Sequence, residues 1–179
     1  MQYGERPLTP AEVAMLTKVY RKSVNLDLIR VVDGFVGLFS VNDRAFTVSN
    51  KIYMKNENPA TYKQTLVHEC CHVWQNQHRG TRYISDAAWA QMSMRDPYIW
   101  QDEISRGRIL WQDFNFEAQA QFIQEVWRDG RKVPTTGDAG EFYDDMPVGS
   151  NVSFMTAELT GFAKESILFV RSLPPLGDF

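Results

Sequence analysis

Histidine and cysteine are scarce in this chain of 179 residues, which has three of the first and two of the second. No stretch approaches the roughly 18 consecutive apolar residues that a membrane-spanning helix needs. The first residues lack the basic start and apolar run of a secretory signal peptide. A formal net charge of -3 gives no basic surface for nucleic acid or an anionic membrane. We therefore expect a protein that is cytoplasmic as synthesised, with neither nucleic acid nor membrane as a partner.

The two cysteines, Cys70 and Cys71, are adjacent in the sequence. A disulfide between neighbouring residues would distort the peptide that joins them. No basic residue close by would lower the pKa of either thiol. We expect both to be small buried side chains rather than thiolate metal ligands or a redox pair.

Length and composition indicate one folded domain over residues 1–179. A chain of this length buries a core without disulfides or other covalent links. Hydrophobic residues make up 44% of the chain and charged residues 23%, which is typical of globular proteins. The sequence shows no internal repeat and no second domain boundary.

Capping signals and periodicity predict an α+β fold. Thr9 and Glu12 form a capping box around Pro10, which predicts a helix to about Lys22. Alternation and turn residues then predict a small, largely antiparallel sheet. The expected strands are 24–32, 35–41, 45–48 and 51–54, and further helices are expected at 59–79, 83–94, 113–128 and 156–171.

All three histidines fall in the segment 65–79, which reads His-Glu-x-x-His from His68 to His72. Asn58 and Gly80 suit the two ends of a helix over this segment. Residues four apart in a helix lie one turn apart on one face, so both imidazoles can bind one metal ion. The other faces are apolar, which predicts a buried helix.

This spacing is typical of a catalytic zinc site. Zinc held by His68 and His72 lowers the pKa of a bound water to about 7, and Glu69 beside them would be the general base and acid. A buried helix whose histidines only bond to backbone or carboxylate groups is the structural alternative. The agreement of motif and capping favours Zn²⁺.

Three segments, 50–54, 68–75 and 113–123, together resemble a family of proteins. These are the zinc metallopeptidases found beside Vgr and Rhs elements of bacterial type VI secretion, and the toxin metallopeptidases of contractile injection systems. In them His-Glu-x-x-His is followed by Val-x-Gln, and a later helix carries Glu-x-Gln-Ala. The resemblance covers roughly residues 9–128. It implies a zincin-like fold and a bacterial effector exported without a signal peptide. A cognate immunity protein or a secretion-apparatus protein would then be a partner.

The resemblance also suggests the third metal ligand. Glu117 aligns with the glutamate of the second family motif and lies off the apolar stripe of its helix, which completes the His₂Glu set of gluzincins. His78 has the spacing of a metzincin ligand, but Gln75 replaces the glycine that would break the helix. In a continuous helix His78 points away from the two motif histidines. Asp113 or another carboxylate is the remaining alternative.

Related peptidases often use a tyrosine or histidine to stabilise the oxyanion, and Tyr98 and Tyr143 are the candidates here. The alternative, which the sequence favours for each of them, is a tyrosine that only packs. Tyr143 belongs to the segment 131–153, which is rich in Gly, Pro and Asp and is a candidate lid. The acidic run 141–145 inside it matches no calcium-loop spacing.

The predicted function is a zinc-dependent metallopeptidase that hydrolyses peptide bonds in a protein or peptide substrate. The hairpin 45–54 would offer an open sheet edge to an extended peptide, the alternative being a hairpin that is buried on both edges. Two alternatives use the same residues: a catalytically silent zinc-binding scaffold, and an amidase that acts on cell-wall peptide cross-links.

Overall fold

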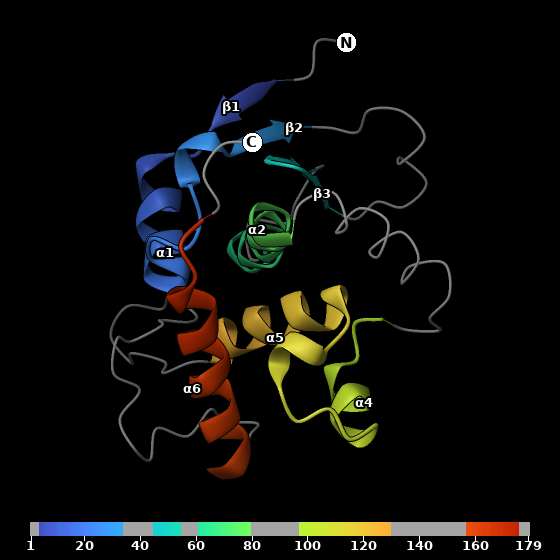
Figure 1. Cartoon of the computed structure of the whole chain (residues 1–179). Helices are drawn as coiled ribbons and strands as arrows, with labels where there is room; N and C mark the ends of the chain where they lie inside the picture. The colour runs from blue at the N-terminus through green and yellow to red at the C-terminus, as the bar shows by residue number, and fades with distance from the viewer. Residues whose placement is uncertain (1–3, 34–44, 55–60, 80–96, 130–156, 176–179) are drawn as a thin grey trace.

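The helix α2 (Tyr62–Arg79) runs between a four-stranded sheet and the helix α5 (Phe116–Asp129) (Figure 1). This computed structural model describes residues 4–33, 45–54, 61–79, 97–129 and 157–175. Around this central layer lie α1 (Pro10–Tyr20), α4 (Trp100–Ser105) and α6 (Ala157–Ser172). α1 packs against α2 and α6, and α4 packs against α5. The expected α+β class is confirmed.

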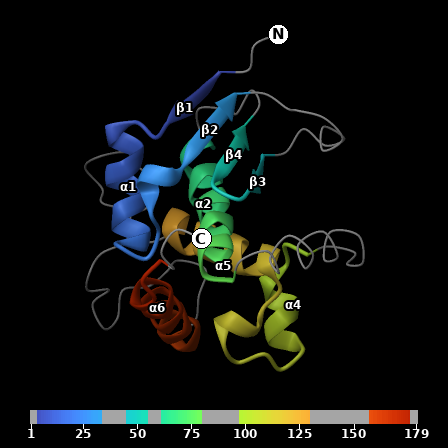
Figure 2. The ribbon, with the colours of Figure 1, turned by 45° about the horizontal axis from the view of Figure 1, so that its top comes forward.

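Two of the three strand pairs are antiparallel, in line with the predicted largely antiparallel sheet, but the central pair is parallel, so the sheet is mixed. Its strands are β1 (Glu5–Pro7), β2 (Arg30–Asp33), β3 (Phe46–Val48) and β4 (Lys51–Met54), in the order β1-β2-β4-β3. β1 and β2 are antiparallel, as are β3 and β4, but β2 and β4 are parallel, with Val31 opposite Ile52 (Figure 2). β3 stands at one end of the order, and β4, which returns from it through the hairpin, lies beside β2 and runs in the same direction.

One strand prediction was wrong, and one strand of the sheet was not predicted. Residues 26–28 form a 3-10 turn, η1 (Leu26–Leu28), where a strand was expected. Its alternating leucines fit either structure, and the Ile29 N–H donates to the Leu26 carbonyl at 3.1 Å. The strand β1 was missed, since it has three residues and ends at Pro7, which has no N–H for a ladder and so favours an edge.

The starts of α1 and α5 follow the sequence signals. The Thr9 hydroxyl accepts from the Glu12 N–H at 3.3 Å, and the Thr9 N–H donates to the Glu12 carboxylate at 2.6 Å, so the capping box is confirmed. α1 ends at Tyr20 rather than Lys22 because Arg21 adopts a left-handed φ of 52°. The Asn115 side chain accepts from the Ala118 N–H at 2.9 Å and begins α5.

The short helix α4 was not predicted. The predicted elements 35–41 and 83–94, the candidate lid 131–153, and the end residues Asn58 and Gly80 lie outside the described residues.

The core forms where α2 meets its neighbours. Every residue from Leu66 to Gln75 is buried, because the sheet covers one side of α2 and α5 the other. The apolar stripe of α5 is buried as predicted, and three apolar side chains of α6 are buried as well. These are Phe116, Ala120, Ile123 and Trp127 on α5, and Ala163, Ile167 and Val170 on α6.

Candidate metal centre

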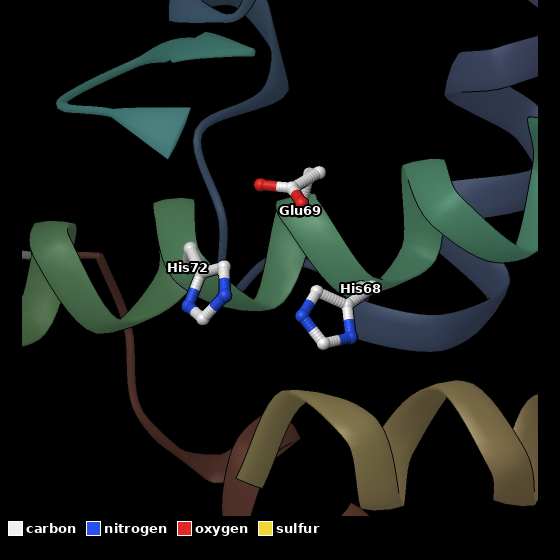
Figure 3. Close-up of side chains that lie close together, drawn as sticks. All are labelled: His68, Glu69 and His72. Atoms are coloured by element: carbon white, nitrogen blue, oxygen red, sulfur yellow. The ribbon is translucent and has the colours of Figure 1, made fainter. Parts of the chain in front are cut away.

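The motif residues of α2 form a buried cluster of possible metal ligands. One ligand atom each from His68, Glu69 and His72 lie within 4.8 Å of one another. All three side chains are at least nine-tenths buried. The two imidazoles project from α2 towards α5, and Glu69 lies on the side of the helix nearer the strands (Figure 3). Helical spacing alone accounts for this arrangement, since the three residues lie within one turn.

A second carboxylate reaches the cluster from α5. The Glu117 Oε2 atom lies 3.4 Å from His68 Nε2 and 3.3 Å from His72 Nε2. Glu117 stands in the first turn of its helix and is 3% exposed. In a tetrahedral zinc site with bonds of about 2.0 Å, neighbouring ligand atoms are about 3.3 Å apart. The two distances from the Glu117 carboxylate thus match the spacing of neighbouring zinc ligand atoms, and imidazole nitrogen and carboxylate oxygen are ligands that zinc takes.

The charges of the cluster depend on one another. Burial alone would lower the pKa of His72, but the Glu117 carboxylate outweighs this and raises it to about 9. Burial alone would raise the pKa of Glu117, but His72 and His68 hold it well below its usual range. These two shifts favour a protonated His72 beside an ionised Glu117.

Glu69 lies in a different electrostatic environment. Burial raises the pKa of its carboxyl group, and the two histidines and a hydrogen bond from Thr47 only partly offset this. The Thr47 Oγ1 atom, on β3, donates to Glu69 Oε2 at 2.8 Å. A carboxylate of raised pKa beside the ligand pair is suited to take up a proton.

Three polar residues of the site were not given a role from the sequence: Thr47, Gln75 and Gln119. Gln75 Oε1 lies 2.8 Å from His72 Nδ1, and Gln75 in turn bonds to Gln119 on α5. The one indication in the sequence was that both glutamines fall inside the motif segments 68–75 and 113–123. Nothing near Thr47 in the sequence indicates its contact with Glu69, 22 residues away.

Of the two candidate tyrosines, Tyr98 lies at the site. Its ring centroid is 6.0 Å from that of His68, and the side chain is half-buried. Tyr143 lies outside the described residues.

The alternative ligand His78 is directed elsewhere. α2 continues as a helix to Arg79, and the His78 ring stacks on Trp74 with 4.5 Å between centroids. Its Nδ1 lies 2.7 Å from the Trp74 carbonyl and its Nε2 lies 3.3 Å from the Leu173 carbonyl. Asp113 is an exposed residue of the 3-10 turn η3 (Trp111–Asp113).

The two cysteines are buried and form no disulfide. Neither is exposed to solvent, and burial raises the pKa of both thiols. Their sulfur atoms are therefore protonated at neutral pH, which confirms the prediction that both are small buried side chains.

Comparisons with protein-family models, curated protein sequences and solved structures find no match to this chain. The assignment of a function therefore depends on the residues of the site. Among the helices that the structure describes, none combines the length and apolar character needed to cross a lipid bilayer.

Proposed function

We propose that this chain is a zinc-dependent metallopeptidase in which His68, His72 and Glu117 hold Zn²⁺ and Glu69 is the general base and acid. The observation that supports this most is the position of the Glu117 Oε2 atom, 3.4 Å and 3.3 Å from the two Nε2 atoms. Three such ligands from two packed helices are the donor set of catalytic zinc sites of the His₂Glu class.

Bound zinc would lower the pKa of a water molecule to about 7 and polarise the carbonyl group to be attacked. Glu69 would accept the proton of the attacking water and pass it to the departing amine. The raised pKa of Glu69 favours the first transfer, and the hydrogen bond from the Thr47 hydroxyl orients the Glu69 carboxylate. Tyr98, beside His68, is the candidate for stabilising the oxyanion.

The proposed substrate is an extended peptide. β3 stands at one end of the order of described strands, and its Thr47 reaches Glu69 directly. A peptide paired with this strand would pass the catalytic carboxylate, with backbone hydrogen bonds supplying most of the affinity. The motif resemblance leads us to propose further that the peptidase is a bacterial effector with a cognate immunity protein.

Metal content and peptide cleavage test the proposal together. We expect one zinc per chain by elemental analysis of the wild type, and loss of most of it in His72→Ala and Glu117→Ala. His78→Ala is the matched control and should keep both metal and activity, because its nitrogens face backbone carbonyls.

Glu69→Gln should keep the metal and lose cleavage of a peptide library. Zinc binding without cleavage of any protein or peptide would identify a silent scaffold, and cleavage confined to cell-wall peptides would identify the amidase. A wild-type protein that neither contains nor takes up zinc would disprove the assignment.

A further inference from the structure

Two buried glutamines connect His72 to the backbone at the start of α5. His72 Nδ1 lies 2.8 Å from Gln75 Oε1, and Gln75 Nε2 lies 3.0 Å from Gln119 Oε1. Both glutamine side chains are fully buried. A buried amide costs free energy unless its donors and acceptors are bonded, and the proposed reaction gives these two amides no task.

Backbone carbonyls set the direction of every hydrogen bond in this connection. Gln119 Nε2 donates to the carbonyls of Gln112 and Phe114, at 3.1 Å and 2.9 Å. Since a carbonyl only accepts, the amide nitrogen must face these two groups and the amide oxygen must face Gln75. Gln75 Nε2 then donates to Gln119 Oε1 and to the Phe116 carbonyl, which is 3.0 Å away.

It follows that Gln75 Oε1 is an acceptor and that His72 Nδ1 carries a proton. The other ring nitrogen, Nε2, is the one that faces Glu117 Oε2 at 3.3 Å. A histidine binds a metal through an unprotonated nitrogen, so a proton held on Nδ1 leaves Nε2 as the ligand atom.

We infer that Gln75 and Gln119 are positioning residues that hold the proton of His72 on Nδ1 and direct Nε2 towards Glu117. The consequence for metal affinity rests on the proposed zinc site, whereas the hydrogen-bonded connection does not. Gln75 also bonds to the carbonyl of Phe116, the residue before Glu117. One side chain thereby orients a ligand on α2 and sets the distance to a ligand on α5.

The second motif histidine differs from His72 in this respect. His68 Nδ1 is buried and has no hydrogen-bond partner among the residues that the structure describes. His68 therefore serves as an internal reference in an experiment that observes both rings.

The test measures hydrogen exchange of the ring N–H groups by NMR of the metal-free protein with ¹⁵N-labelled histidine. Gln75→Met keeps the length of the side chain and removes its polar atoms. Gln77→Met is the matched control, since Gln77 lies on the same helix and makes comparable bonds. Its Oε1 accepts from the Asn25 N–H at 2.8 Å, and its Nε2 donates to Asn50 at 2.9 Å.

We expect the Nδ1–H of His72 to exchange slowly in the wild type and in Gln77→Met, and at least about tenfold faster in Gln75→Met, while the signals of His68 stay unchanged. Zinc affinity should fall about 10-fold to 100-fold in Gln75→Met and stay at the wild-type value in Gln77→Met. If Gln75 only stabilised the fold, Gln75→Met and Gln77→Met would both lower thermal stability. Neither the exchange rate of the His72 Nδ1–H nor the zinc affinity would then differ between the two variants.

Gln119→Met gives a second test if Gln75→Met does not fold, with faster exchange and about tenfold weaker zinc binding expected. Unchanged exchange of the His72 Nδ1–H in the folded variant would overturn the inference. If the wild type binds no zinc, the proposed function fails, and the exchange rates of the metal-free protein still decide whether the glutamines hold the ring.

Discussion

The role of Tyr98 at the site can be tested by removing one atom, its hydroxyl oxygen. Its ring lies beside His68, and we expect Tyr98→Phe to lower kcat by about 10² with zinc content unchanged, because one donor to the oxyanion is lost. Tyr53→Phe is the control, since the Tyr53 ring stacks on Phe46 in the hairpin. The same substitution at Tyr143 examines the other candidate. Near-wild-type kcat in both Tyr98→Phe and Tyr143→Phe would dismiss an oxyanion role for tyrosine.

The pKa of His72 predicts how zinc binding depends on pH. Glu117 raises this pKa to about 9 against the effect of burial, so the metal must displace a proton from His72 at any lower pH. Apparent zinc affinity should rise by about tenfold per pH unit between pH 7 and 9 and then level off. Competition with a chelator measures the affinity, and calorimetry in two buffers measures proton release. An affinity that stays constant between pH 7 and 9 would contradict the raised pKa.

At the scale of elements, Thr47 joins β3 to the motif helix. Its hydroxyl donates to Glu69 Oε2 and lowers the pKa of that carboxyl group. Thr47→Val removes the donor and keeps a β-branched side chain suited to a strand. Because loss of the bond raises the pKa of Glu69, the acidic limb of the kcat/KM profile should move to higher pH. A pH profile like that of the wild type would show that the hydroxyl does not act on Glu69.

Glu12 joins three elements through its carboxylate. It accepts hydrogen bonds from Arg6 on β1, from the Thr9 N–H before α1 and from Tyr62 on α2. Burial alone would raise its pKa, but these bonds lower it to about 2. A depressed pKa contributes stability above the pKa of the unfolded chain, and this stability is lost as pH falls towards 2.

We therefore expect Glu12→Gln to be less stable at pH 7 and to have a flatter dependence of stability on pH between 5 and 2. The loss should be about 1 kcal/mol, because the Arg6 side chain is 35% exposed and solvent screens the pair. Urea unfolding at several pH values measures it. The control is Glu5→Gln, which breaks an exposed pair with Lys51 and should change little. Parallel pH curves for wild type and Glu12→Gln would refute the assignment.

At the scale of the whole molecule, the proposed ligands join the two helices at its centre. Zinc that binds only the folded chain adds about 4 kcal/mol at a free concentration of 1,000 Kd. For a domain of this size the unfolding temperature should rise by about 10 °C and return on chelation. Calorimetry of wild type, Glu117→Ala and His78→Ala provides the measurement. An equal rise in Glu117→Ala would place the metal elsewhere.

The sequence by itself determined those features of the protein that arise between residues within about one turn of the same helix. The capping box at Thr9, the common face of His68 and His72 and the buried stripe of α5 follow from spacing, because backbone geometry relates residues three or four apart. The exclusion of His78 from the proposed ligand set has the same basis.

Only the tertiary structure decided which separate segments meet. The parallel pairing of β2 with β4 depends on where the hairpin enters the sheet. The approach of Glu117 Oε2 to both histidines spans 49 residues from His68, and the bond between Gln75 and Gln119 spans 44. Such contacts depend on how whole elements pack, and local propensity carries no information about that choice. The α2–α5 contact therefore turns a two-histidine helix into a candidate three-ligand site with fixed side-chain directions.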